Sequence, residues 1–415
     1  MPANGRRWQT PFHGPSILKW RSPESASAHI VNNARTGNSM LDTPTVVRSE
    51  KVARPGAEVV EAVRAAAARD LPSLVQKIDL EGYYPESVMR EFGRLGAYAQ
   101  HLPGRNDAVD LVTAINAMAA AGEYCLSTSF CMWCQDALAW YIYASDSDAL
   151  KREIGSQAAV GEVLGGTALS NPMKNFFGIE AMRLKGRRGD GGYVVKGLLP
   201  YVSNLGDDHY FGAVFEVEDG ASKRNVMAIV PCAAAGLSLA ANTKFAALDG
   251  TRTFSVQMRD VFIPDSWVVA DPAEDYVKRI RAGFVLLQAG MAFGLIRDCI
   301  KLMEQTKASL GHVNKYLEVQ PEPLGEQLMA MEAEVARLAA TPFETDPTYW
   351  RSVIEARLAA GEASLAAAQA AMLHCGARGY VQSGAAQRRL REAYFVAIVT
   401  PATKQLRKML ADMVH

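Results

Sequence analysis

The chain has 415 residues, which is more than one hydrophobic core usually serves, so we expect two or three structural parts. Apolar residues make up 49% and charged residues 21%, as in an ordinary globular protein, and 44 basic residues balance 44 acidic ones. This zero net charge gives no reason to expect binding to nucleic acid or to an anionic membrane. No uninterrupted apolar run reaches the roughly 18 residues of a membrane span, and six Cys are too few for a disulfide scaffold, so the cytoplasm is the expected location.

Residues 1–45 mix Pro, Gly, Ser, Asn and basic residues without any periodicity. Such a segment cannot bury enough apolar surface to fold, so we interpret it as disordered, or as an extension upstream of a true start at Met40. Arg6 and Arg7 are not followed by an apolar stretch, so the pattern is not that of a secretory signal.

The pattern of residue types in the remaining chain changes twice. Residues 46–158 are predicted to form an N-terminal helical domain, because stretches such as "AEVVEAVRAAAARDL" and "DLVTAINAMAAAGEY" are amphipathic and rich in helix formers. Residues 159–272 alternate or cluster β-branched and aromatic residues, as in "YFGAVFEV" and "NVMAIVP", which predicts a middle β-barrel or β-sandwich domain. Residues 273–415 return to Ala, Leu and Glu runs at helical spacing, which predicts a C-terminal helical bundle. The fold class is therefore α+β, in the order helices, β domain, helices.

Several kinds of chemistry lack support. Cys131 and Cys134 have CxxC spacing, but their apolar helical context and the lack of a second pair favour buried structural cysteines. The seven His are scattered without ligand spacing, so no metal site is predicted. The basic stretch "KGRRGDGGY" falls between two strands and is interpreted as a solvated hairpin turn on Asp190-Gly191.

Four stretches carry the strongest signal, and they occur in a set order: "GGTALSNP" (165–172), "GGYVVKGLLPYVSN" (191–204), "GTRTFSVQMRDVFIPDSWVVA" (250–270) and "HCGARGYVQSGAAQRRLREAYFVAIVTPATKQLRKML" (374–410). Together they resemble the acyl-CoA dehydrogenase superfamily of flavoproteins from about residue 57 to the end. The resemblance implies an N-terminal α-domain, a middle β-domain and a C-terminal four-helix bundle. It also implies FAD between the β-domain and the bundle, and a homodimer or homotetramer in which a second subunit supplies part of the FAD site.

The resemblance assigns cofactor contacts in the β-domain. Leu169 and Ser170 stand where the family's backbone and hydroxyl groups meet the flavin pyrimidine ring. Tyr201 replaces the Trp that packs against the isoalloxazine, and Ser203 replaces the Thr beside flavin N5. Without the surrounding motifs, Tyr201 and Ser203 would be read as an ordinary strand pair.

In the bundle, the G-G-x-G-Y pattern of the family falls on a segment that has lost one Gly. The cofactor-binding positions there are Gly376, Ala377 and Gly379, and Thr403 in the last motif is assigned to the same site.

The last motif places Thr400 where the family carries the Glu that removes the α-proton of the thioester. Pro401 stands where the family has the Gly that breaks the helix. A Thr hydroxyl cannot act as a base near neutral pH without an activator, so the base position is kept and the base is absent. Some family members carry the Glu on the first bundle helix instead, and there the chain has Phe284.

Three functions remain open. The chain is an FAD-dependent oxidoreductase acting on an acyl thioester of CoA or of a carrier protein, with its base supplied from elsewhere. Alternatively it is a flavin-dependent monooxygenase of the same fold, which needs no α-proton base, or a non-catalytic relative that keeps the flavin.

Residues 1–40 lack a periodic apolar face, and this leads to a prediction about the stability of the protein. Their removal should leave the melting temperature unchanged, because nothing in the segment can add to a core. Thermal unfolding of full-length and truncated protein tests this, and a fall of several degrees after truncation would show that the segment docks.

Overall fold

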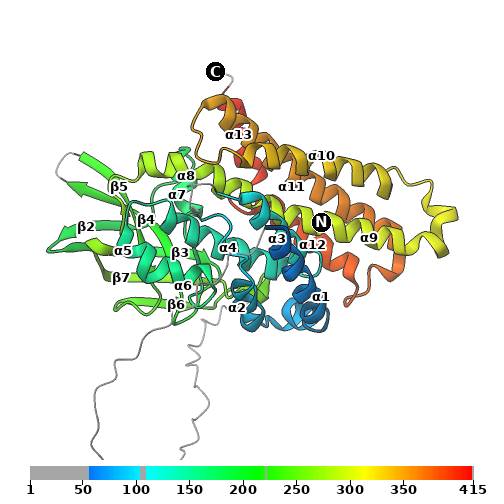
Figure 1. Cartoon of the computed structure of the whole chain (residues 1–415), viewed down its shortest axis with the longest axis horizontal. Helices are drawn as coiled ribbons and strands as arrows, with labels where there is room; N and C mark the ends of the chain where they lie inside the picture. The colour runs from blue at the N-terminus through cyan, green and yellow to red at the C-terminus, as the bar shows by residue number, and fades with distance from the viewer. Residues whose placement is uncertain (1–55, 103–108, 220–221, 414–415) are drawn as a thin grey trace, which may run out of the picture. The chain divides into compact units, whose positions relative to one another are not determined.

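The elements follow the predicted order of helices, strands and helices (Figure 1). The computed structural model describes residues 56–102, 109–219 and 222–413. Residues 1–45, which carry the prediction of disorder, lie outside this part of the chain. The N-terminal helices are α1 (Gly56–Glu81), α2 (Glu86–Arg94), α3 (Leu111–Gly122), α4 (Leu126–Tyr143), α5 (Asp148–Leu150) and α6 (Ser156–Ala159). The C-terminal helices are α8 (Glu274–Leu287), α9 (Ala289–Asn314), α10 (Pro321–Ala339), α11 (Pro347–Cys375), α12 (Ala385–Ile398) and α13 (Thr403–Asp412).

The middle part contains a single mixed sheet with the strand order β6-β7-β3-β2-β4-β5-β8, and with β1 pairing beside β4. Its strands are β1 (Gly165–Thr167), β2 (Lys185–Gly189), β3 (Gly192–Val202), β4 (Tyr210–Asp219), β5 (Ser222–Pro231), β6 (Leu237–Ala240), β7 (Phe254–Pro264) and β8 (Val268–Ala270). Pairing is antiparallel except where β1 and β2 run parallel to β4. The predicted hairpin joins β2 to β3, and Gly191 takes φ 69° in its turn, a conformation that glycine adopts without strain.

One element inside the β region was not predicted. Helix α7 (Ser170–Phe176) follows β1 directly, with Pro172 in its first turn, where a missing N–H costs nothing. Seven residues are too few for a helical apolar period to appear in the sequence, so this segment could not be separated from the surrounding strands.

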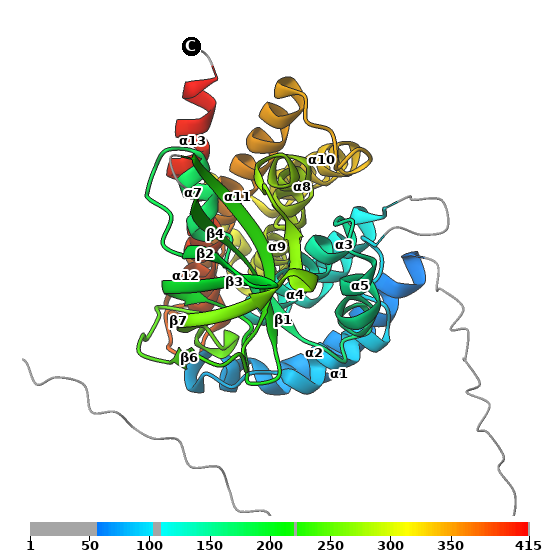
Figure 2. The same ribbon diagram turned by 90° about the vertical axis from the view of Figure 1, so that its left-hand side faces the viewer.

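Helix α4 lies between the sheet and the bundle (Figures 1 and 2). Every residue from Leu126 to Ile142 is buried, which requires a helix that is packed all round. Cys131 and Cys134 are both free and buried on it, and burial raises the pKa of both thiols well above the usual range. The structural interpretation of this CxxC pair is therefore confirmed.

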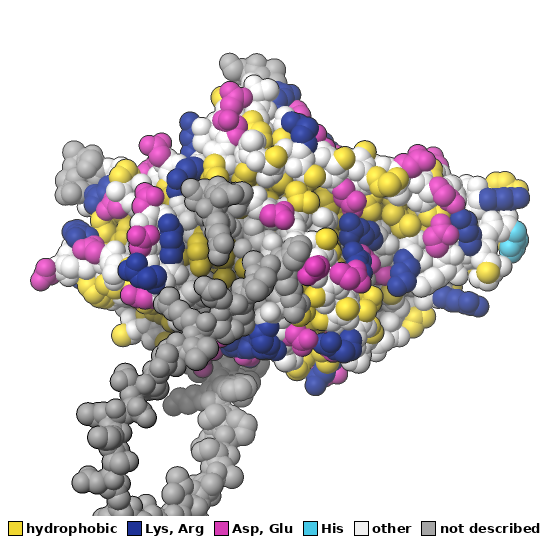
Figure 3. Space-filling view, in the orientation of Figure 1, with side chains coloured by type: hydrophobic (Ala, Val, Ile, Leu, Met, Phe, Trp, Pro, Cys, Tyr) yellow, Lys and Arg dark blue, Asp and Glu magenta, His cyan; other side chains and the backbone are white. Residues whose placement is uncertain are grey.

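The two helical parts share one hydrophobic cluster, while a second cluster fills the interior of the β region. The continuous stretch Glu274–Asn314 is long and apolar enough to cross a membrane by composition, although no uninterrupted apolar run marked it in the sequence. Within the described residues, 83% of its most apolar window is buried, so it acts here as a core helix pair. Figure 3 shows basic and acidic side chains interspersed over one face, in keeping with the zero net charge. The domain boundaries near residues 158 and 272 stay predictions.

Helices α3 and α9 cross at very close range. A Cβ on Gly294 would lie 2.4 Å from the carbonyl oxygen of Ala119 and 2.7 Å from the Cα of Gly122. Only glycines allow this approach of two backbones, and the crossing fixes the N-terminal helices against the bundle.

A buried ion cluster ties α12 to the rest of the bundle. Arg389 is fully buried and donates to Asp298 at 2.7 Å, to Glu392 at 2.8 Å and to the Glu123 carbonyl at 2.6 Å. Burial of Glu392 opposes its ionisation, yet Arg388 and Arg389 hold its pKa below the usual range. The cluster therefore remains charged at neutral pH.

Replacing Arg389 by Met should lower the free energy of unfolding by about 3 kcal/mol, because Asp298 and Glu392 would keep buried charge with less compensation. The lowered pKa of Glu392 means that its contribution is present above the ordinary Glu range and is lost as pH falls through the folded value. The difference in the free energy of unfolding between wild type and Arg389→Met should therefore become smaller at acidic pH. Urea unfolding at several pH values measures both effects, with Arg351→Met, which breaks an exposed pair with Glu355, as the control. Equal losses in the two variants would contradict the role of the cluster.

Candidate functional site

A cavity of about 960 Å³ opens where the sheet meets helices α4, α8, α12 and α13. Its lining comes from segments far apart in the sequence, including the ends of β1 and β3, helix α7 and the 3-10 turn η2 (Asp249–Thr251). Two kinds of side chain dominate. Aromatic residues that contact one another form one part of the lining, here called the aromatic end, and hydroxyl groups line the wall next to the sheet.

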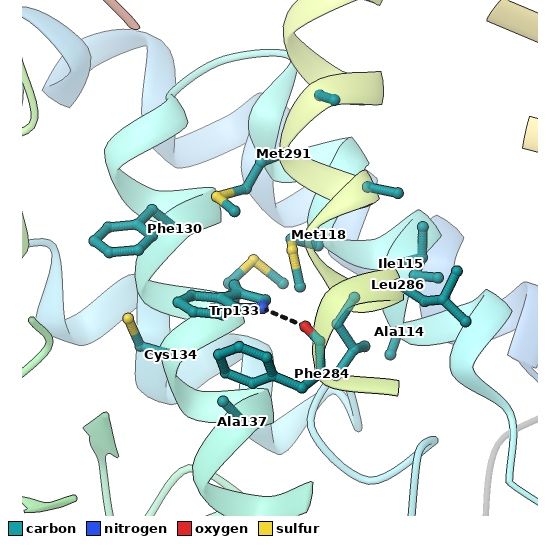
Figure 4. Close-up of a cluster of buried hydrophobic side chains, with 14 of the residues drawn as sticks. Ala114, Ile115, Met118, Phe130, Trp133, Cys134, Ala137, Phe284, Leu286 and Met291 are labelled. Carbon is teal, nitrogen blue, oxygen red and sulfur yellow. Dashed lines mark hydrogen bonds between the residues drawn. The ribbon is translucent and has the colours of Figure 1, made fainter. Parts of the chain in front are cut away.

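The aromatic end is formed by α4, α8 and α12. Phe130 stacks on Trp133 with ring centroids 5.7 Å apart, and its other contact is with Phe395, edge to face, at 4.6 Å. Trp133 meets Phe284 at 5.0 Å and donates its indole N–H to the Phe284 carbonyl at 3.3 Å (Figure 4). This end of the cavity is therefore apolar and has its one indole donor already satisfied, which suits an apolar part of a ligand. Phe284 supplies no carboxylate.

Three hydroxyls along the sheet wall form a connected hydroxyl row. Ser203 at the end of β3 lies 2.6 Å from Thr253, and Thr253 lies 2.8 Å from Thr251. Thr251 donates to the carbonyl of Leu248 at 2.7 Å. All three side chains line the cavity.

Asn204, which sequence reasoning did not single out, holds this wall in place. It is fully buried, has φ 61°, donates to the Gly165 carbonyl at 2.6 Å and accepts from the Tyr84 hydroxyl at 2.6 Å. Its backbone N–H donates to the Thr251 carbonyl at 2.9 Å. Asn tolerates the left-handed region better than most residues, so Asn at the end of the β3 strand pattern was the signal that could have marked it.

Thr400 lies between α12 and α13, where Pro401 ends the helical run as the sequence predicts. Its hydroxyl is 2.8 Å from that of Ser170, so the two predicted positions meet across the cavity. The Thr400 carbonyl accepts from Gln288 at 2.9 Å, and Gln288 in turn accepts from Arg357 at 2.6 Å. Burial lowers the pKa of Arg357 to about 10. This arrangement holds the Thr400 backbone, and within the described chain the hydrogen-bond partner of its hydroxyl is the neutral hydroxyl of Ser170.

Charged groups gather among the lining residues from α7, the segment after it and α13. Among the described lining residues Glu180 is the one carboxylate, and it pairs with Lys174 at 3.1 Å. Burial opposes its ionisation, but the contact with Lys174 lowers its pKa, so it is a poor base at neutral pH. Lys404 and Arg407 also line the cavity.

The structure brings most, not all, of the predicted site residues together. Tyr201, 55% exposed, lines the cavity and meets Phe245 edge to face at 5.6 Å. Thr403 lines it and donates to the Ala397 carbonyl at 3.0 Å. Leu169 is buried next to Ser170 and is not among the lining residues, and its backbone N–H donates to the Thr167 hydroxyl at 3.2 Å.

The predicted glycine-rich positions lie elsewhere. Gly376, Ala377 and Gly379 belong to or follow the turn η4 (Gly376–Arg378) at the C-terminal end of α11, and they are not among the residues that line this cavity. No contact within the described chain places them at the site, so their cofactor role stays a prediction.

The chain is similar in sequence and architecture to known proteins. Residues 57–162 match the family described as acyl-CoA dehydrogenase, N-terminal domain. Over 381 residues the chain is 22% identical to human mitochondrial short-chain specific acyl-CoA dehydrogenase, with 88% of this chain and 92% of that protein covered. The chain belongs to the acyl-CoA dehydrogenase superfamily.

Solved structures of acyl-CoA dehydrogenases share this fold. Butyryl-CoA dehydrogenase from Megasphaera elsdenii matches with a TM-score of 0.76 at 15% identity, covering 86% of this chain and 97% of that one. A glutaryl-CoA dehydrogenase from Mycobacterium smegmatis in complex with FADH2 matches with a TM-score of 0.69 at 17% identity, covering 88% and 95%. The acyl-CoA dehydrogenase fold predicted from the motifs is thus confirmed.

The assignment of Thr400 to the base position stays a prediction from the motifs. Thr400 lines the cavity with a hydroxyl that contacts Ser170, and it offers no carboxylate. Phe284, the second possible base position, is part of the aromatic end.

Proposed function

We propose that this chain is an FAD-dependent oxidoreductase that acts on an acyl thioester of CoA or of a carrier protein. One observation carries the proposal. A single cavity at the junction of sheet and bundle unites Ser170, Tyr201, Ser203 and Thr400, which come from separate segments and were assigned to one site by their motifs. A reducing, cytoplasmic location belongs to the same proposal, and all six cysteines are free.

The residues present fit a flavin. The cavity of about 960 Å³ is at the upper end of the roughly 300–1,000 Å³ typical of ligand sites, and it offers both an aromatic surface and hydroxyl groups. Tyr201 would pack against the ring system, while Ser170 and Ser203 would meet its polar edge, with Thr403 nearby. The backbone groups of Leu169 already bond to Thr167 and Met173, so a contact of Leu169 with the flavin rests on the motif alone. FAD when bound would supply the acceptor for the two electrons removed from the acyl group.

The chain's own residues divide the remaining tasks. The aromatic end formed by Phe130, Trp133 and Phe284 would take the apolar acyl group and exclude water. Lys174, Lys404 and Arg407 would favour the phosphates of a CoA or phosphopantetheine arm. Arg357 and Gln288 hold the Thr400 backbone, so the Thr400 and Ser170 hydroxyls can orient the thioester but cannot take its α-proton.

A homodimer or homotetramer is part of this proposal. Gly376, Ala377 and Gly379 are not among the residues that line the cavity of their own chain, which supports a cofactor role for them at the site of a second copy. Next to them, Tyr380 and Val381 are exposed large apolar side chains, which suits a contact between subunits.

One observation favours a second candidate, a flavin-dependent monooxygenase. The cavity has a hydroxyl at Thr400 and an ion-paired Glu180 as its one described carboxylate, so no described lining residue is suited to abstract an α-proton.

Anaerobic titration of the purified holoprotein with a panel of acyl-CoA and acyl-carrier thioesters distinguishes the oxidoreductase from the monooxygenase. Bleaching of bound flavin supports the oxidoreductase, whereas inert bound flavin together with uptake of free reduced flavin supports the monooxygenase. Protein that binds no flavin contradicts both.

The packing assigned to Tyr201 makes a prediction about flavin affinity. Tyr201→Ala should weaken FAD binding by roughly 1–3 kcal/mol, because the ring contact with the flavin is lost. Fluorescence titration with FAD measures this, and Tyr201→Phe, which keeps the ring, should bind normally. If Tyr201→Ala retains flavin as well as wild type does, Tyr201 does not pack against the flavin.

The missing base makes a second prediction. Thr400→Glu should speed anaerobic flavin reduction by a straight-chain acyl-CoA, because a positioned general base contributes typically 10²–10⁴-fold. Glu is larger than Thr and must fit beside Ser170, so Thr400→Gln, of the same size without a base, is the matched control. Rapid bleaching by wild type that slows in Thr400→Glu would show that another residue already performs proton abstraction.

A further inference from the structure

The hydroxyl row of Ser203, Thr253 and Thr251 has a fixed direction. It ends on the Leu248 carbonyl, which can only accept a hydrogen bond, so the single hydroxyl hydrogen of Thr251 is used there. Thr251 must then accept from Thr253, which uses the hydrogen of Thr253. Thr253 in turn must accept from Ser203.

Ser203 therefore has no hydrogen left to offer the cavity. Its two lone pairs face no donor within the row, and they can only accept. Any orientation in which Ser203 donates to a ligand breaks one of the three internal hydrogen bonds, of which the one at Thr251 is buried. An internal hydrogen bond lost in this way leaves a hydroxyl of the row without its partner, which costs free energy, so the row favours the acceptor state of Ser203.

The backbone around the row is fixed as well. Of the four non-glycine residues with positive φ in the described chain, three flank it: Asn204 at 61°, Leu248 at 68° and Arg252 at 44°. Strained backbone of this kind persists only where the surroundings determine it, and it gathers at functional sites. A Cβ on Gly250 would lie 2.6 Å from the Tyr83 carbonyl oxygen, so the turn carrying Thr251 is also tightly seated.

A hydroxyl that can only accept distinguishes the two redox states of a flavin. Oxidised flavin has an unprotonated N5 that accepts hydrogen bonds. Addition of two electrons and two protons to the ring system places an N–H donor at N5. We propose that Ser203 accepts this N–H, and that the site consequently binds reduced FAD more tightly than oxidised FAD. The inference rests on the proposed function, which places the flavin beside Ser203.

The test compares the dissociation constants of oxidised and dithionite-reduced FAD for the full-length protein under anaerobic conditions. The ratio of oxidised to reduced dissociation constants should exceed one. One hydrogen bond gained or lost corresponds to roughly three- to tenfold in this ratio, and tenfold is about 30 mV in the midpoint potential of the bound flavin. Equal constants, or tighter binding of oxidised FAD, would overturn the inference.

Matched variants at Thr251 test whether the hydroxyl row sets this ratio of dissociation constants. Thr251→Val keeps the shape but removes the end of the row, so Thr253 can turn toward Ser203 and Ser203 becomes free to donate. Oxidised FAD should then bind more tightly, and the ratio should fall roughly three- to tenfold. Thr251→Ser keeps the hydroxyl and should retain the wild-type ratio. An unchanged ratio in Thr251→Val would overturn the inference.

Because Thr251 is buried, its substitution risks misfolding, so a variant at Ser203 provides an independent test. Ser203→Ala removes the acceptor, so the affinity for reduced FAD should fall while that for oxidised FAD stays the same. A loss for both forms alike would assign Ser203 to packing and overturn the inference while leaving the flavin site intact. If neither form binds to wild type, the proposed function fails together with this inference.

Discussion

The cavity depends on one constraint, the burial of helix α4 on all its faces. The helix contacts β1 and the turn η2 on the sheet side, and α8 and α9 on the bundle side. Because it has no solvent face, it cannot shift without disturbing both, and the two halves of the cavity keep one relative position. Phe130 and Trp133 on α4 form the closed aromatic end, and the Cys131 thiol lies against the carbonyl of Thr251.

The site combines a firmly held backbone with neutral side-chain chemistry. Pro401 follows the end of α12, and Gln288 with Arg357 holds the turn between α12 and α13. The functional group at Thr400, however, is a neutral hydroxyl bonded to another neutral hydroxyl. A frame that positions a side chain this firmly specifies where a ligand lies, and the side chain decides what can be done to it.

Hydrogen-bond direction adds information that a list of polar residues does not contain. Ser, Thr and Tyr can each donate or accept, so a sequence cannot say which role a hydroxyl plays. The carbonyl of Leu248 removes that freedom from three hydroxyls at once. The chemical character of the sheet wall is thus set by a backbone group that is not itself part of any motif.

The sequence by itself determined the order of helices and strands, the hairpin on Asp190-Gly191 and the helix break at Pro401, because these depend on local periodicity and on residues with special backbone geometry. Its ordered motifs also indicated which segments share a site. Tertiary structure alone decided the short helix α7, the contact of Ser170 with Thr400 and the role of Asn204, since residues distant in sequence meet only after packing. That Gly376 does not line the cavity was likewise undecidable from motifs, because a motif does not say which surfaces pack together.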